Sequence, residues 1–268
     1  MADRREIEGD IIMGWADRKR PTPELRKDGQ GRVIHVSTPV GDLQGLITPI
    51  DLRYVVVQLD APDPMHPDDW SLSIGGEVER PFELNFEELR KFPGVTVRCV
   101  HECSGSDADF FDYLKSGRET YGCNRCEQQE GKPDRLDPEA QHQGVLSSGE
   151  WTGVPLATVL DKAGVKSGAV SVLAQGFDRG RPAEWATPGA LAIPEEEISF
   201  EKSLPLEKAL DRDTLLAWAL NGEYIRHIHG GPVRLITPGW SGNWSVKWLQ
   251  KLEVLDHLPK LYYQNQHF

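Results

Sequence analysis

Val95-Thr-Val-Arg-Cys-Val-His-Glu-Cys-Ser-Gly-Ser106 alternates between two kinds of side chain and then ends in a turn. Residues 96–103 are predicted to form a strand, with Cys99, His101 and Cys103 on one face. A cysteine at the end of a strand, just before a Ser-Gly-Ser turn, has its sulfur held rigidly while its front stays open. That position suits a thiolate that binds a metal or attacks a substrate. The alternative for Cys103 is a small buried apolar residue.

The length and composition of the chain indicate a globular protein with a sizeable core. Its 268 residues are 38% hydrophobic and 27% charged, which allows one large domain or two small ones. The net charge of −12 argues against nucleic acid as a partner, and an anionic substrate would need local positive charge. No apolar run is long enough for a membrane span, and the acidic N-terminus does not resemble a signal peptide. We therefore expect a cytoplasmic protein.

The four cysteines allow a second interpretation, a structural zinc site. A reducing cytoplasm favours thiols or metal ligands over disulfides, and Cys123 and Cys126 have the spacing of half a zinc site. Cys99 and Cys103 would lie about 13 Å apart on one strand, at ~3.3 Å per residue. That separation is too large for one tetrahedral ion without a bend, so a four-cysteine site is the weaker interpretation.

The chain divides into a polar extension, one domain and a short tail. Residues 1–45 are polar and are expected to lie over a surface or to be partly disordered. The folded domain is expected over residues 46–258, and a C-terminal tail over residues 259–268. Inside the domain, residues 107–143 form a polar loop of a length that is usually functional. Two interpretations of this loop stay open: a lid over Cys103, or an insertion held by its own cysteine pair.

Short strands with a few helices are predicted along the domain. Asn85 is a capping residue for a helix ending before Pro93, and residues 151–164 are predicted as a second helix that ends at Gly164. Residues 179–202 are predicted as a loop. Besides the 96–103 strand, strands or extended segments are predicted over 52–59, 70–78, 170–174, 214–220, 233–237 and 245–254. Without a repeated strand–helix–strand rhythm, the predicted class is α+β with largely antiparallel or mixed sheets.

Groups that suit a phosphate gather in the last third of the chain. Gly230 and its neighbour Gly231 follow His229 and let the backbone approach a ligand closely. Arg234 and Lys247 can neutralise a phosphate, Arg234 by a planar fork and Lys247 as a point charge. The turn over residues 240–245 offers serine hydroxyls and backbone N–H groups. Taken singly, each of these residues could equally be a solvated charge or a turn residue.

Several motifs, in order, resemble the molybdenum-cofactor domain of the sulfite oxidase family. The matching segments are Leu46-Ile-Thr-Pro, Cys103-Ser-Gly, Trp151-Thr-Gly-Val-Pro-Leu, Gln175-Gly-Phe-Asp178, Ser203-Leu-Pro-Leu, Leu216-Ala-Trp-Ala-Leu-Asn-Gly222, His229-Gly-Gly-Pro-Val-Arg234 and Ser245-Val-Lys-Trp248. The resemblance implies a mixed-sheet molybdopterin-binding catalytic domain over residues 46–258, without the immunoglobulin-like dimerisation domain that usually follows. The sulfane dehydrogenase branch looks nearer than the sulfite oxidases themselves.

The resemblance also implies the roles of individual residues. Cys103 would be the thiolate ligand of the molybdenum and the catalytic residue, a role that a soft sulfur ligand suits. Residues 55–58 would lie along the cofactor, and residues 245–247 would hold its phosphate. The cofactor-binding positions implied by the resemblance are Val55, Val56, Val57, Gln58, Cys103, Asp178, His229, Arg234, Ser245, Val246 and Lys247.

Departures from the family pattern bear on the substrate. The sulfite oxidases that the chain resembles have Arg-Asn-His in place of Val56-Val57-Gln58, and another arginine in place of Ala108. The family's active-site tyrosine corresponds to Phe268. Two lost arginines argue against tight binding of free sulfite.

The implied function is a two-electron oxygen-atom transfer on a small sulfur or related substrate. An external electron-transfer protein is expected as partner, such as a cytochrome, a haem subunit or a membrane subunit, because the Cys123/Cys126 motif lacks the histidine of a haem attachment site. Two alternatives are an S-oxide or N-oxide reductase with the same cofactor, and a non-catalytic zinc- or cofactor-binding subunit. The sequence leaves the oligomeric state open.

Overall fold

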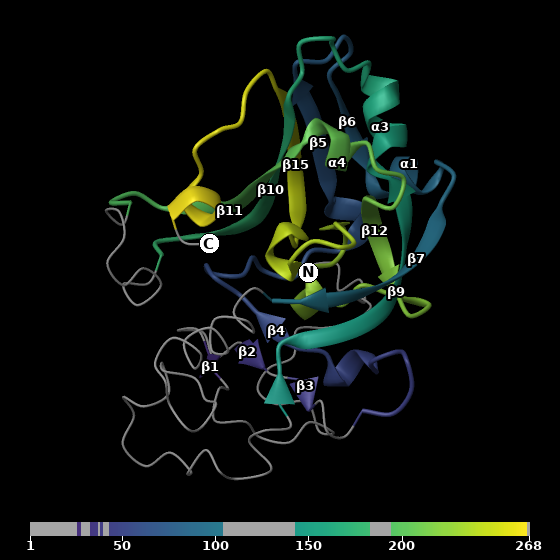
Figure 1. Ribbon diagram of the computed structural model, residues 1–268, viewed down its shortest axis with the longest axis vertical. Helices are drawn as coiled ribbons and strands as arrows, with labels where there is room; N and C mark the ends of the chain where they lie inside the picture. The colour runs from purple at the N-terminus through teal and green to yellow at the C-terminus, as the bar shows by residue number, and fades with distance from the viewer. Residues whose placement is uncertain are drawn as a thin grey trace, which may run out of the picture.

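Two five-stranded sheets form the body of the protein in a computed structural model (Figure 1). The structure describes residues 26–27, 33–36, 38–39, 43–103, 143–182 and 194–266. The Cys123/Cys126 pair, Ala108 and Phe268 therefore lie outside the described residues, as do nearly all of the 107–143 loop and most of the N-terminal extension. Among the described helices, none combines the length and apolar character that crossing a bilayer requires.

The first sheet has the strand order β11-β10-β15-β5-β6. Its neighbours are antiparallel except β15 and β5, which are parallel. This mixture confirms the predicted α+β class. The strands are β5 (Ser71–Gly76), β6 (Phe82–Asn85), β10 (Ser171–Gly180), β11 (Ile198–Pro205) and β15 (Leu249–Leu255).

The second sheet has the order β13-β12-β9-β7, with β14 also beside β12, and all of its pairs are antiparallel. β7 and β9 pair in unbroken register from Val95 opposite Gly153 to Glu102 opposite Leu146. The strands are β7 (Val95–Glu102), β9 (Leu146–Pro155), β12 (Leu215–Leu220), β13 (Glu223–Tyr224) and β14 (Arg234–Ile236).

The main hydrophobic core lies between the two sheets, and the opposite face of the second sheet carries the candidate site. Leu216 and Trp218 of β12 join the main core, whereas Leu215 and Ala217 join a smaller cluster with Trp151. Successive side chains of a strand point to opposite faces, so β12 separates the two clusters. The odd-numbered residues of β7 share the Trp151 side.

Short helices and turns close the ends of the strands. α1 (Phe86–Arg90) begins at Asn85, whose side chain accepts from the Glu88 backbone while Glu88 accepts from the Asn85 backbone. α3 (Leu156–Ala163) ends at Gly164, which has a left-handed φ of 71°. The remaining short elements are α4 (Leu206–Ala209), the 3₁₀ turns Ile50–Leu52, Pro67–Asp69, His227–His229 and Gly242–Trp244, and the π-helix Tyr262–Gln266.

Two segments that we expected outside the domain pack against it where the structure describes them. β2 (Val33–Val36) lies within the expected extension and pairs with β4 (Val55–Val56). The other short pairs are β1 (Arg26–Lys27) with β2, and β3 (Thr38–Pro39) with β8 (Gln143–Gly144). In the expected tail, Leu261, Tyr262 and Tyr263 are buried.

Three predicted element boundaries are wrong. Residues 151–155 belong to β9, because Gly153 fits against the β12 backbone so closely that a Cβ would overlap the Leu216 carbonyl oxygen. Residues 198–202 lie in β11 and not in a loop, because this segment pairs with β10. Its polar composition suggested a loop, but the structure buries Lys202 within the strand. Residues 245–248 precede β15, because Trp248 has a φ of 48° that interrupts the strand.

Candidate active site

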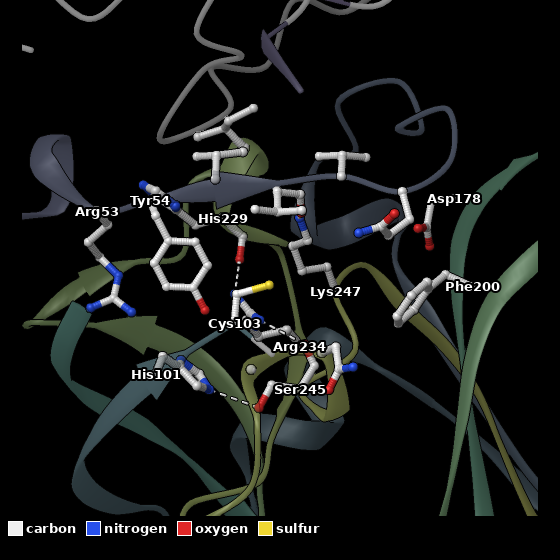
Figure 2. Close-up of a pocket in the computed structure, with 17 residues that line it drawn as sticks. Arg53, Tyr54, His101, Cys103, Asp178, Phe200, His229, Arg234, Ser245 and Lys247 are labelled. Carbon is white, nitrogen blue, oxygen red and sulfur yellow. Dashed lines mark hydrogen bonds between the residues drawn. The ribbon is translucent and has the colours of Figure 1, made fainter. Parts of the chain in front are cut away.

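A pocket of about 720 Å³, open to solvent, lies on the Trp151 side of the second sheet. Figure 2 shows its side chains converging from five parts of the chain: the 53–58 segment, the end of β7, the last third of β10, β11, and the segment from residue 228 to residue 247. These parts of the chain are far apart in sequence. The lining residues are Arg53, Tyr54, Val55, Val56, Val57, Gln58, His101, Cys103, Asp178, Phe200, Ile228, His229, Arg234, Gly242, Asn243, Ser245 and Lys247.

Cys103 lies at the pocket wall, directly after the last residue of β7. Its backbone N–H donates to the Val145 carbonyl oxygen at 2.8 Å, so the β7–β9 pairing extends one residue past the strand. The backbone under the thiol is therefore fixed by the sheet, while the half-buried side chain faces the pocket. This is the arrangement that the sequence predicts for a thiolate ligand.

The structure brings ten of the eleven implied cofactor positions together in this one pocket. The exception is Val246, whose side chain is fully buried in the main core. Its backbone nevertheless helps to hold the site in shape, because the Val246 carbonyl oxygen accepts a hydrogen bond from the Leu235 backbone N–H at 2.8 Å. Val246 thus fixes the turn that carries its neighbours Ser245 and Lys247.

Arg234 ties together the two turns that border the pocket. Its two terminal nitrogens donate to the carbonyl oxygens of His229 and Ser245, each at 2.7 Å. The guanidinium also lies over the Trp151 ring, 5.1 Å from its centroid. Burial lowers the pKa of Arg234 to about 10, so it remains a cation at neutral pH. Its Nε is buried and has no hydrogen-bond partner among the described residues.

Asp178, which is buried, and Lys247, which is half-buried, both face the pocket and influence each other's charge. Burial raises the pKa of Asp178 to about 7, although the charge of Lys247 opposes the shift. Burial and the charge of Arg234 lower the pKa of Lys247 to about 7. The Lys247 ammonium donates to the Val56 carbonyl oxygen at 2.5 Å, and Oδ1 of Asp178 lacks a partner among the described residues. A buried acceptor of this kind requires a donor.

His229 and Ser245 use part of their polar groups within the protein. Nε2 of His229 donates to the Ile50 carbonyl oxygen at 3.1 Å, which fixes its ring. We expected the Ser245 hydroxyl to hold phosphate oxygens. Instead it bonds to Nε2 of His101 at 2.8 Å and accepts from the Thr237 backbone N–H at 3.1 Å. A serine hydroxyl has few remaining bonding positions after these contacts.

Sequence reasoning missed several residues that line the pocket. Arg53 is buried, donates to the Ser148 carbonyl at 2.8 Å and lies 5.1 Å from the centre of the Trp151 ring. Arg53 and Tyr54 lie in a segment whose other residues are mostly apolar, so the sequence predicts a strand there. The only signal of a site was the presence of a guanidinium and a phenol hydroxyl among these apolar residues. His101 shares the predicted face of Cys103, which was an available signal.

Comparison with known proteins identifies the family. A family model described as the oxidoreductase molybdopterin binding domain matches residues 58–263. The chain belongs to this family. A solved structure of the sulfane dehydrogenase SoxCD from Paracoccus pantotrophus is similar, with 28% identity and a TM-score of 0.63. That match covers 92% of this chain and 51% of the other. These findings confirm the predicted family, the mixed-sheet fold and the molybdopterin cofactor.

Curated relatives of this molybdopterin-binding domain include nitrate reductases. One from Ulva prolifera is 30% identical over 219 residues, covering 80% of this chain and 22% of the relative. One from Mycosarcoma maydis is 33% identical over 228 residues, covering 81% and 21%. The chain therefore spans about a fifth of the length of these relatives.

The pocket of this oxidoreductase domain fits a phosphorylated pterin. Oδ1 of Asp178 can accept from a ring N–H, and Nε of Arg234 can donate. Gly176 leaves space that a side chain would fill, since a Cβ there would collide with Asp178 Oδ1 and lie 2.7 Å from the Lys247 carbonyl oxygen. Within the described residues, no group of three or more His, Cys, Asp or Glu side chains could hold a metal ion. A single thiolate beside a cofactor that brings its own sulfur ligands fits this composition.

Proposed function

We propose that this domain catalyses a two-electron oxygen-atom transfer on a small sulfur or related substrate other than free sulfite. The electron pair moves in the direction opposite to the oxygen atom. The position of Cys103 carries the proposal, because a sheet-fixed thiol opens onto a pocket that fits the family's cofactor. When bound, molybdopterin supplies the molybdenum and its two-electron redox chemistry. The protein's own residues bind and orient it.

Each of the polar residues has a distinct task in this proposal. Cys103 provides the thiolate that anchors the molybdenum. Lys247 neutralises the cofactor phosphate, and Asp178 accepts from the pterin ring. Arg234 holds the two bordering turns at a fixed separation through its two carbonyl contacts. Preorganisation of this kind keeps the reacting centre in place without movement during the reaction.

The charge of the pocket supports a substrate that carries partial or full negative charge on oxygen. Arg53, Arg234 and Lys247 line the described pocket with only one carboxylate, Asp178, among them. In a protein of net charge −12, this local excess of cations attracts anions that the surface repels. Electrons would leave or arrive through an external electron-transfer protein.

A reductase acting on an S-oxide or N-oxide is the second candidate, with the same residues in the same tasks. Its support is that the curated relatives are nitrate reductases. This second candidate fixes the direction, because its substrate gives up an oxygen atom and takes up two electrons, whereas an oxidase of a sulfur substrate does the reverse. Steady-state assays with a reduced and with an oxidised artificial electron carrier would distinguish them.

The test of the proposed function is elemental analysis of the purified protein, with molybdenum, tungsten and zinc measured per chain. We expect about one molybdenum per chain in wild type and near none in Cys103→Ser, whose circular dichroism should stay unchanged. Cys99→Ser is the matched control, because Cys99 lies on the same strand but packs against the Trp151 cluster outside the pocket lining. Zinc without molybdenum, from a host that makes the cofactor, would contradict the proposal.

A further inference from the structure

Tyr54 places a phenol hydroxyl at the Cys103 end of the pocket. The residue precedes β4, and its backbone N–H donates to the Ser147 hydroxyl of β9 at 3.4 Å. Figure 2 shows its ring beside Cys103, with the hydroxyl directed toward the same end of the pocket. Burial has the largest effect on the pKa of the Tyr54 phenol and raises it, and Cys103 has the largest effect among its charged neighbours. The two side chains therefore share one environment.

The Tyr54 hydroxyl oxygen is held close to the backbone on the opposite wall. A Cβ built on Gly242 would collide with this oxygen and would lie 3.1 Å from the Glu102 carbonyl oxygen. Gly242 thus leaves the space that the phenol needs, directly beside the residue that precedes Cys103. The hydroxyl position results from this close approach and from the anchored backbone of Tyr54.

The hydroxyl of Tyr54 makes no hydrogen bond with any residue that the structure describes, although Tyr54 is only partly accessible to solvent. The hydroxyl is not one of the fully buried unpartnered atoms, so its O–H is open to the pocket and can donate to a molecule bound there. Val56 and Val57, in the same segment, offer only methyl groups to the pocket. His101 is engaged with Ser245. Tyr54 therefore contributes the one hydroxyl donor of the 53–58 segment, beside the cation Arg53 and the amide of Gln58.

We propose that Tyr54 is a substrate-binding residue whose hydroxyl donates a hydrogen bond to an oxygen atom of a small oxyanion or oxide beside Cys103. This inference rests on the proposed function and adds the residue that positions the substrate. A hydrogen bond from a neutral phenol to a charged oxygen is stronger than one between neutral groups. Its loss should weaken binding of an oxyanion about 10- to 100-fold.

The experiment measures the dissociation constant of sulfate, a redox-inert oxyanion, with the purified holoprotein by titration calorimetry. Molybdenum per chain is measured on the same samples. Tyr54→Phe removes only the hydroxyl and should raise the dissociation constant about 10- to 100-fold, with molybdenum per chain unchanged. Tyr224→Phe is the control, because it removes a phenol hydroxyl that contacts Arg90 outside this pocket.

Gly242→Ala is the second variant, since it keeps the phenol but displaces its oxygen. It should weaken sulfate binding as Tyr54→Phe does, and the double variant should lose little more than either single one. Equal dissociation constants for wild type and Tyr54→Phe, at equal molybdenum content, would overturn this inference and leave the proposed function standing. A lower molybdenum content in Tyr54→Phe would also overturn it, because the hydroxyl would then serve the cofactor. Wild-type holoprotein that binds no sulfate would overturn it, and wild type without molybdenum would overturn both proposals.

Discussion

Nε2 of His101 lies 2.8 Å from the hydroxyl oxygen of Ser245, across 144 residues of sequence. This bond joins β7, which Cys103 directly follows, to the turn that carries Lys247. The His101 ring also packs edge-on against Trp151, with 5.2 Å between ring centroids. Burial and the nearby charges of Arg234 and Arg53 lower the pKa of His101 well below its usual value, so the bond is between neutral groups. The strand that precedes Cys103 and the turn that carries Lys247 are thereby fixed relative to one another.

His101→Leu should separate these two parts of the site. We expect the free energy of unfolding to fall by about 1–3 kcal/mol, because the variant removes a buried hydrogen bond and leaves the Ser245 hydroxyl with one partner fewer. Molybdenum per chain should fall as well. Urea denaturation and elemental analysis check both effects. An unchanged molybdenum content would show that the His101–Ser245 bond is not needed to hold the cofactor.

Gly230→Ala should damage the site more than a comparable glycine substitution elsewhere. Gly230 has a φ of 98°, and a Cβ there would lie 2.6 Å from Cβ of Lys247. Gly239→Ala is the matched control, because Gly239 has a φ of 79° but no atom within 4 Å of its added Cβ. Both variants incur a backbone cost of about 1–3 kcal/mol, and only Gly230→Ala should also lose molybdenum. Equal molybdenum contents would refute the role of this close approach.

Gln264→Ala should loosen the C-terminal π-helix from β11. The side-chain amide of Gln264 accepts from the Ser203 backbone N–H at 2.8 Å and donates to the Ser203 carbonyl at 3.3 Å. Losing both bonds should lower the free energy of unfolding by about 1–3 kcal/mol. Thermal denaturation of holoprotein is the measurement. If the melting temperature does not change, the C-terminal segment contributes nothing to the stability of the domain.

Lys202 should make stability rise with pH above about 8. Burial lowers the pKa of Lys202 to about 8 in the folded protein, against about 10.5 when the chain is unfolded. Between these values the unfolded chain binds more protons, so the free energy of unfolding increases with pH in this window. Lys202→Met should remove that part of the increase. Urea denaturation of both proteins at pH 7.5 and pH 10 gives the difference, and Lys91→Met, at an exposed site, is the control.

If wild type and Lys202→Met respond to pH in parallel, the assignment of the slope to Lys202 is wrong. Other groups that titrate near pH 10 are common to both proteins, so they cancel in the comparison. The variant also removes the bond from the Lys202 ammonium to the Tyr263 carbonyl oxygen, which lowers stability at every pH. The prediction therefore concerns the slope and not the absolute value.

Local patterns in the sequence were sufficient to predict those elements whose structure depends on residues close together in the chain. The alternation in residues 96–103 predicts β7 and the placement of Cys103 at its end, because side-chain direction follows from the backbone repeat. Asn85 predicts the start of α1, since a cap bonds within three residues. Gly164 predicts the end of α3, because glycine readily adopts the left-handed conformation that closes a helix. The family motifs added the identity of the cofactor and most of the pocket lining.

The sequence by itself determined the fold class, the family and the placement of Cys103 directly after β7, because each of these depends on a local pattern or an ordered set of motifs. Only the tertiary structure decided how the remaining groups are used. It brought Tyr54 and Arg53 into the pocket, turned the Ser245 hydroxyl toward His101, and left Oδ1 of Asp178 without a partner among the described residues. Those outcomes depend on contacts between segments 95 to 191 residues apart in the sequence, and no local repeat encodes such pairings.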